Sequence, residues 1–241
     1  MILDSHANII CGPETGFFLR PFAEQQSRVK HVIKRFKQRL DIDQSETSEI
    51  LRSSESAIEF FDQIMSLVCN RTGLDKDVWA EKSPRNCLHY SRLSCEMPET
   101  IFISIIRDGR DVITSRFPNR DDYYCSVERY IESVRAILSF NSERHLIVRY
   151  EDMVTDPEVL IRKVLEFCGM QYSRDILMEY QTSSVTRNSK QAKVSEPISK
   201  QWLGRWKDPE HSERIARFMS DSDALHWMKV SGYDPIKVEM E

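Results

Sequence analysis

The stretch from Ile101 to Ile106 constrains the fold of this chain more than any other part of its sequence. It is apolar and mostly β-branched, interrupted only by Ser104, and this composition is typical of a parallel strand covered on both faces. Arg107 follows directly, and Gly109 begins a predicted helix. In open α/β sheets ligands bind at the carboxyl ends of the strands, where the next helix presents unpaired N–H groups. The sequence therefore predicts an anion site after this strand.

Arg107 and Ser115 carry the donors of this predicted site. The guanidinium is a planar fork of N–H groups, and Ser115 adds a hydroxyl about two helical turns further along the chain. This combination suits phosphate better than carboxylate. For a single arginine after a strand, an ion pair to Asp108 or Asp111 at an ordinary helix start is the commoner explanation. The segment by itself leaves both interpretations open.

Strands and helices alternate along the chain. Besides the strand at 101–106, the pattern predicts strands at 78–81 and 145–150, a helix with Pro84 in its first turn, and helices at 123–140 and from Asp156 to Gly169. The alternation predicts an α/β fold, with one domain built on a parallel sheet and flanking helices.

Amphipathic helices are also expected before the first of these strands. Apolar residues recur at helical spacing in 29–40 and in 58–68, on either side of a polar stretch from Asp41 to Glu55 that we interpret as a surface linker. Residues 183–200 are rich in Ser, Lys and Gln and show no periodicity, and the end of the chain is helical again.

Composition excludes several classes of protein. With 241 residues, 40% of them hydrophobic and 30% charged, the chain can build one α/β domain with its own core. A net charge of −4 gives no overall attraction to nucleic acid. No apolar run approaches the roughly 18 to 20 residues of a membrane span, and no signal peptide opens the sequence. The six cysteines show neither C-x-x-C nor metal-ligand spacing, which predicts buried free thiols and no metal.

Five segments in the same order resemble the sulfotransferase family. They are LDSHANIICGPET from Leu3, EKSPRN from Glu81, the Arg107 segment, VRYEDMVTDPE from Val148, and ISKQWLGRWK from Ile198, the last followed by SGYDP. The resemblance is to the tyrosylprotein branch and its bacterial-type relatives. The cytosolic phenol and steroid enzymes instead carry Lys-Thr-His where this chain has Lys-Ser-Pro from Lys82.

The resemblance implies a P-loop-like fold and 3′-phosphoadenosine 5′-phosphosulfate as the sulfuryl donor, with no metal. In this family an Arg and a Ser at the spacing of Arg107 and Ser115 hold the 3′-phosphate of the donor. Tyr150 matches a tyrosine that contacts the donor nucleotide. The late loop that closes on the adenine and the 3′-phosphate is matched by Ser199, Lys200, Gly204 and Arg205.

The resemblance also implies the catalytic groups. Lys82 matches the lysine that contacts the sulfonate and the bridging oxygen, although a surface lysine paired with Glu81 would look the same in the sequence. Glu14 matches the general base of the tyrosylprotein branch, with a cap or turn acid as the alternative. Trp202 and Trp206 offer stacking faces, but two tryptophans at this spacing predict core anchors on a helix.

One motif of the family is absent. The Gly-rich loop resembling R-S-G-T-T, which cradles the 5′-phosphosulfate, and the strand before it would lie upstream of Met1. The seven glycines form neither a G-x-x-x-x-G-K-[ST] nor a G-x-G-x-x-G pattern, which also argues against a nucleotide kinase. Two hypotheses remain: residues 1–241 are an N-terminally incomplete sulfotransferase domain, or the chain is a non-catalytic nucleotide-binding or partner-binding relative. From either we expect weakened nucleotide binding and little turnover in the 241-residue chain.

The partner and the compartment are left open by the sequence. The acceptor implied by the family is a hydroxyl group on a peptide tyrosine, a sugar or a small molecule, and Arg116 and Arg120 would suit phosphate or an acidic acceptor. A homodimer is also compatible with the family. The compartment would be the Golgi lumen if an anchor precedes the chain and the cytoplasm otherwise. Cys11 matches one half of a disulfide of the tyrosylprotein branch, but the other position is Ala80, which argues against an oxidising compartment.

Overall fold

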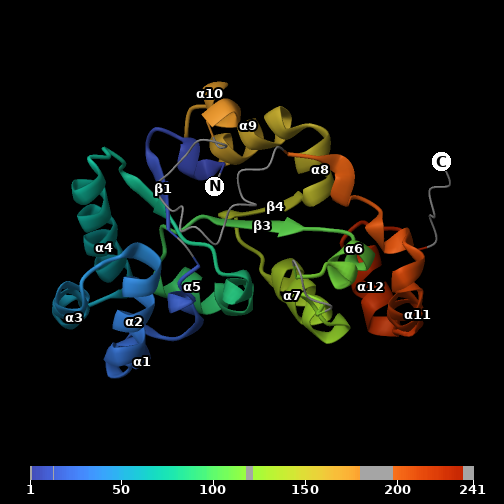
Figure 1. Cartoon of the computed structure of the whole chain (residues 1–241), viewed down its shortest axis with the longest axis horizontal. Helices are drawn as coiled ribbons and strands as arrows, with labels where there is room; N and C mark the ends of the chain where they lie inside the picture. The colour runs from blue at the N-terminus through green and yellow to red at the C-terminus, as the bar shows by residue number, and fades with distance from the viewer. Residues whose placement is uncertain (1, 13, 118–121, 180–197, 236–241) are drawn as a thin grey trace. The chain divides into compact units, whose positions relative to one another are not determined.

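The structure, a computed structural model, describes residues 2–12, 14–117, 122–179 and 198–235 of the chain. Its contacts divide the chain into two compact units, Met1–Thr100 with Gln171–Pro197, and Ile101–Met170 with Ile198–Glu241. Each unit contains a pair of parallel strands with helices beside it (Figure 1). This arrangement confirms the predicted α/β class, while one domain over residues 1–241 stays a prediction.

The strands of the first unit are short. β1 (Ile9–Cys11) pairs in parallel with β2 (Val78–Ala80), with Ile10 opposite Trp79. β2 confirms the strand predicted at 78–81. β1 was not predicted, because three residues are too few to show a strand period.

Helices of the first unit enclose an aromatic core. α2, α3 and α4 lie side by side (Figure 1), and Phe17, Phe36, Phe60 and Phe61 are fully buried among them. The rings of Phe17 and Phe60 stack with their centroids 4.8 Å apart. The helical elements are η1 (Leu3–Ser5), η2 (Phe17–Leu19), α1 (Phe22–Ser27), α2 (Val29–Leu40), α3 (Gln44–Ser53), α4 (Ala57–Thr72), η3 (Pro84–His89), α5 (Tyr90–Glu96) and α10 (Asp175–Glu179).

The surface linker predicted from Asp41 to Glu55 is wrong, because this stretch contains α3. Asp43 caps the helix by accepting from the Ser45 N–H at 2.7 Å, and the Glu46 carboxylate accepts from the Asp43 N–H at 3.3 Å. This capping box satisfies N–H groups that a helix end otherwise leaves unpaired. Local hydrogen bonding thus decides the conformation of a stretch whose composition looks like a loop.

In the second unit, β3 (Phe102–Ile106) and β4 (His145–Arg149) run parallel, with Phe102 opposite His145 and Ile106 opposite Arg149. Both strands confirm the predictions. The remaining elements are α6 (Gly109–Thr114), α7 (Val127–Ser139), α8 (Tyr150–Thr155), α9 (Pro157–Phe167), η5 (Lys200–Trp202), η6 (Arg205–Lys207), η7 (Pro209–His211), α11 (Ser212–Ser220) and α12 (Ser222–Val230).

Helix ends in this unit follow the expected capping rules. Asp156 caps α9 by accepting from the Val159 N–H at 3.2 Å, and Gly169 follows the helix with a φ of 69°. α7 begins four residues later than predicted, at Val127, because the Ser126 side chain caps it. Most of the aperiodic stretch at 183–200 lies outside the described residues.

The remaining sequence predictions concern membrane spans and thiols. None of the helices in the described ranges has the length and apolar character needed to cross a bilayer. The cysteines are free thiols, as predicted, although only Cys69 and Cys87 are buried.

Candidate functional site

The first group of predicted residues lies on the loops that follow β1 and β2. The Glu81 carboxylate joins the two loops. One of its oxygens accepts from the Thr15 N–H at 3.0 Å, the Thr15 hydroxyl at 2.9 Å and the Ser83 hydroxyl at 2.6 Å, and the other accepts from the Asn86 amide at 2.7 Å. Ser83 in turn accepts from the Gly16 N–H at 2.8 Å. Because β1 and β2 are adjacent and parallel, their carboxyl ends present both loops on the same edge.

This junction brings Lys82 and Glu14 together as an ion pair. Their side chains are 72% and 44% exposed, respectively. Glu81 is occupied by Thr15, Ser83 and Asn86, so the alternative of a surface Lys82 paired with Glu81 does not describe this structure. An accessible ammonium and carboxylate in contact are a suitable pair for neutralising a leaving group and accepting a proton.

A cavity of about 500 Å³ adjoins this pair. It is open to solvent, and its lining carries more cationic than anionic side chains. The lining residues are Glu14, Thr15, Gly16, Leu19, His31, Lys34, Arg35, Gln38, Ser83, Pro84 and Arg85.

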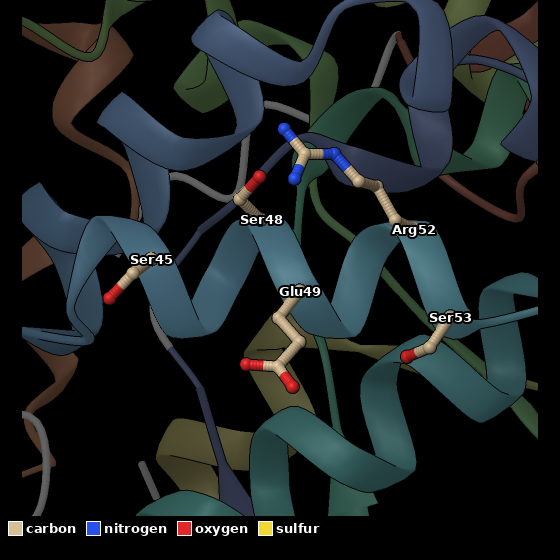
Figure 2. A pocket seen from close by; sticks show the side chains of 5 residues that line it. All are labelled: Ser45, Ser48, Glu49, Arg52 and Ser53. Carbon is tan, nitrogen blue, oxygen red and sulfur yellow. The ribbon is translucent and has the colours of Figure 1, made fainter.

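Another hollow, of about 560 Å³, contains none of the predicted residues. Figure 2 shows its lining side chains, all of which project from the single helix α3. A hollow lined by one helix brings no groups from different elements together, so it does not form part of the candidate site.

The second group lies at the carboxyl ends of β3 and β4. Arg107 follows β3, Tyr150 follows β4, and the guanidinium carbon lies 4.5 Å from the centroid of the tyrosine ring. A terminal nitrogen of Arg107 donates to the Trp202 carbonyl. The Nε atom of Arg107 is buried and has no partner among the described residues. A buried, unpaired donor is costly, and the Arg107 side chain as a whole is 19% exposed.

Asp111 connects this arginine to the late loop. Its side chain is 3% exposed and lies 3.3 Å from a terminal nitrogen of Arg107. It also accepts from the backbone N–H groups of Gly204 at 2.9 Å and Trp206 at 3.1 Å. Burial raises the pKa of the Asp111 carboxyl, against the opposing effect of Arg107. From the sequence, Asp111 was expected only as an alternative ion-pair partner of Arg107. Its position one helical turn after Arg107 was the available signal for its role in the site.

Ser115 is the C-cap residue of α6. Its hydroxyl donates to the Asp111 carbonyl at 2.8 Å, which leaves the oxygen's lone pairs available. Gly109, at the start of α6, allows the rings of Tyr130 and Phe218 to pack closely against the backbone. A β-carbon there would lie 2.6 Å from the Tyr130 ring and 2.7 Å from the Phe218 ring. The ion pair between Arg107 and Asp111 uses a terminal nitrogen of the guanidinium and leaves Nε unpaired. This ion pair is therefore compatible with an anion site at Arg107.

The other predicted residues of the late loop, Ser199, Lys200 and Arg205, lie near Gly204 in sequence but make different contacts. The Ser199 hydroxyl caps η5 by accepting from the Gln201 N–H at 3.2 Å, Lys200 is exposed, and Arg205 lies 5.0 Å from the Trp202 ring. The structure thus links Arg107 to Tyr150 and, through Asp111, to Gly204. The described contact of the Ser115 hydroxyl is with the Asp111 backbone carbonyl. For Ser199, Lys200 and Arg205, the structure describes no direct contact with these residues.

The prediction that Trp202 and Trp206 are core anchors is wrong. Trp202 is 37% exposed, and Trp206 is partly exposed with the Arg110 guanidinium 4.2 Å from its ring. Gly204 separates them with a φ of 70°, so they lie on different short helices rather than on one face.

The arginines predicted to suit phosphate or an acidic acceptor are Arg116 and Arg120. Arg116 is engaged by Glu210 at 3.0 Å and the Tyr123 hydroxyl at 2.8 Å. Arg120 lies outside the described residues.

Cationic and hydroxyl side chains at the ends of parallel strands are typical of α/β proteins that bind anions. Residues 1–174 match the model of the Sulfotransferase family. Since this match covers more than half of the sequence, the chain belongs to the sulfotransferase family, and it is an enzyme by family.

Curated relatives point to the tyrosylprotein branch. Protein-tyrosine sulfotransferase 2 of Gallus gallus is 25% identical over 231 residues, which cover 85% of this chain and 58% of the relative. Protein-tyrosine sulfotransferase of Drosophila melanogaster is 22% identical over 256 residues, covering 97% of this chain and 48% of the relative. The chain therefore spans about half the length of these relatives.

A solved structure supports the fold. The sulfotransferase domain of the Synechococcus PCC 7002 olefin synthase aligns with a TM-score of 0.64 at 15% identity, covering 97% of this chain and 88% of that domain. At this identity the similarity shows a shared fold and not a shared substrate.

Proposed function

We propose that this chain, as a sulfotransferase domain over residues 1–241, takes part in sulfuryl transfer from 3′-phosphoadenosine 5′-phosphosulfate to a hydroxyl acceptor. The observation that carries the proposal is the buried, unpaired Nε of Arg107, held between Tyr150 and Asp111. A phosphate dianion supplies the acceptor that this nitrogen lacks.

The donor nucleotide is proposed to occupy the group around Arg107. The guanidinium and the Ser115 hydroxyl bind its 3′-phosphate, and Tyr150 holds the plane of the guanidinium. Gly204, fixed by Asp111, leads into the loop that contacts the nucleotide, with Ser199, Lys200 and Arg205 as further contacts. Positioning of this kind supplies most of the catalysis in transfers that proceed through loose, in-line transition states.

Lys82 and Glu14 are proposed to act on the reacting groups. The acceptor oxygen attacks sulfur while the bond from sulfur to the 5′-phosphate oxygen breaks. The acceptor proton goes to the Glu14 carboxylate, and the negative charge that develops on the leaving phosphate is balanced by the Lys82 ammonium.

Peptide tyrosine is the acceptor we propose. The names of the curated relatives give tyrosine as their acceptor, and the cavity beside Glu14 carries Lys34, Arg35 and Arg85. Cationic walls of this kind favour an acceptor with acidic residues near the hydroxyl.

Calorimetric titration with 3′-phosphoadenosine 5′-phosphate tests the nucleotide assignment. Arg107→Ala is expected to weaken binding by at least about tenfold, the low end for hydrogen bonds to charged groups. Arg135→Ala is the matched control, because Arg135 is 54% exposed in a 3.9 Å ion pair on the same unit. Unchanged affinity in Arg107→Ala would remove this arginine from the site.

Transfer of labelled sulfate to an acidic tyrosine peptide tests the reaction. Lys82→Met is expected to abolish whatever transfer the parent chain shows and to leave nucleotide affinity within about twofold, since Lys82 acts on the leaving charge. Nucleotide binding without any transfer in the parent chain would favour a non-catalytic relative.

A further inference from the structure

The closing segment of the chain is tied to the Arg107 strand end through Glu151. One oxygen of the Glu151 carboxylate accepts from the Asp108 N–H at 3.0 Å, and the other accepts from the Tyr233 hydroxyl at 2.5 Å. Asp108 is the direct neighbour of Arg107, and Glu151 is the direct neighbour of Tyr150. A single carboxylate thus fixes the residues next to both members of the stacked pair.

Tyr233 is built into this position. The residue is 5% exposed, and the Arg149 guanidinium lies 4.1 Å from its ring centroid. Burial, followed by the hydrogen bond to Glu151, raises the pKa of the Tyr233 hydroxyl, so it remains a donor throughout the ordinary pH range. A short hydrogen bond from a neutral hydroxyl to a carboxylate is among the stronger kinds.

A second link joins the same two segments. Arg110 is held by Asp108 at 2.7 Å, and its guanidinium lies 3.4 Å from the Asp234 carbonyl and 3.5 Å from the Pro235 carbonyl. The carbonyls of the two residues that follow Tyr233 therefore face Arg110 in the first turn of α6. The Tyr233 contact is not an isolated one, because the whole Tyr233–Pro235 stretch packs against this loop.

We propose that Tyr233 is a positioning residue for the 3′-phosphate of the donor. Through Glu151 it fixes the backbone at Asp108, and with it the direction of the Arg107 guanidinium against Tyr150. The phosphate itself is contacted by Arg107 and Ser115, and Tyr233 acts only through them. The inference rests on the proposed function, because it concerns the same nucleotide site. It adds that the end of the chain sets the selectivity of the site for a 3′-phosphorylated nucleotide.

The test compares two nucleotides by calorimetry on the full chain. The affinity ratio of 3′-phosphoadenosine 5′-phosphate to adenosine 5′-phosphate measures selectivity for the 3′-phosphate. Tyr233→Phe removes only the hydroxyl and is expected to lower this ratio about fivefold, within the range for the net contribution of an ordinary hydrogen bond, because Tyr233 acts on the phosphate only indirectly. Affinity for adenosine 5′-phosphate is expected to change by less than about twofold. Glu151→Gln, which keeps the shape but removes the charge, is expected to lower the ratio in the same way.

Tyr124→Phe is the matched control, because Tyr124 is a 45% exposed tyrosine of the same unit. A merely structural role for Tyr233 would lower the melting temperature or weaken both nucleotides equally. An unchanged ratio in both Tyr233→Phe and Glu151→Gln would overturn the inference while leaving the proposed function intact. A parent chain with no preference for the 3′-phosphorylated nucleotide would overturn both. If Tyr233→Phe does not fold, Glu151→Gln decides the question in the same way.

Discussion

Arg107 makes three contacts within the protein, and its Nε donor remains unpaired. Asp111 and the Trp202 carbonyl both engage its Nη2 atom, and the Tyr150 ring lies against its face. Nε stays buried without a partner in the described part of the chain. Those contacts fix the plane of the guanidinium before any ligand arrives. Preorganisation of this kind reduces the entropy lost on binding.

Lysine cannot reproduce this arrangement. Arg107→Lys keeps the positive charge but loses the planar fork and the Nε donor, so we expect affinity for 3′-phosphoadenosine 5′-phosphate to fall about tenfold. Calorimetry measures the change, and Arg135→Lys, the same substitution at an exposed arginine, is the control. Parent-like affinity in Arg107→Lys would show that a point charge suffices.

Glu14 offers a second test at the level of one residue. Glu14→Gln keeps the size of the side chain but cannot accept a proton, so we expect the rate of sulfate transfer to fall by about a hundredfold or more. Nucleotide affinity should not change, because Glu14 is proposed to touch the acceptor and not the nucleotide. A transfer rate equal to that of the parent chain would exclude Glu14 as the base.

Among the elements, the junction of the loops after β1 and β2 depends on Glu81. Glu81→Ala would leave the hydrogen-bond donors of Thr15, Ser83 and Asn86 without their acceptor. We expect the free energy of unfolding to fall by about 1 to 3 kcal/mol, as for the loss of a partly buried polar network. Urea denaturation measures the change, and Glu99→Ala, at an exposed position, should stay within about 0.5 kcal/mol of the parent. A loss no larger than that of the control would show that the network does not hold the junction.

The β3–β4 pair carries a pH-sensitive contact. The Nδ1–H of His145 donates to the Phe140 carbonyl at 3.1 Å, so the neutral ring accepts from the Ser104 hydroxyl at Nε2, 2.9 Å away. Burial lowers the pKa of His145 from 6.5. The unfolded chain therefore binds the proton more readily, and stability falls as the pH drops below 6.5 toward the lowered pKa.

His145→Gln is expected to reduce this pH dependence. Between about pH 8 and pH 5 the free energy of unfolding should fall more in the parent chain than in the variant, because only the parent protonates this ring. Urea denaturation at both pH values measures the difference, and His89 and His211 titrate in both proteins alike. Equal pH dependence would contradict the assignment of the protonation-sensitive contact to His145.

The elements that could be predicted from the sequence are those with a strong pattern or a clear stop signal. β3, β4 and α9 have apolar runs, an Asp-Pro start or a glycine end, and each was found close to its observed bounds. β1 and α3 were missed, because three residues carry no period and a capping box outweighs polar composition. Asp111 was missed as an organising group because its role depends on Gly204 and Trp206, which are distant in sequence.

For the molecule as a whole, family membership followed from five ordered segments and the α/β class from the alternation of strands and helices. The structure and the comparisons confirm both. The two groups of site residues belong to different compact units. Glu14 and Lys82 lie in the unit of β1 and β2, whereas Arg107, Ser115 and Tyr150 lie in the unit of β3 and β4. Their roles can therefore be separated by experiment, with variants of the first group affecting transfer and variants of the second affecting nucleotide binding.

The central claim is that the group around Arg107 recognises a 3′-phosphate, and the affinity of the parent chain for two nucleotides tests it most directly. Calorimetry should show 3′-phosphoadenosine 5′-phosphate binding at least about tenfold more tightly than adenosine 5′-phosphate, since one nucleotide carries the dianion that Arg107 and Ser115 bind and the other does not. Equal affinity for the two nucleotides, or binding of neither, would contradict the account.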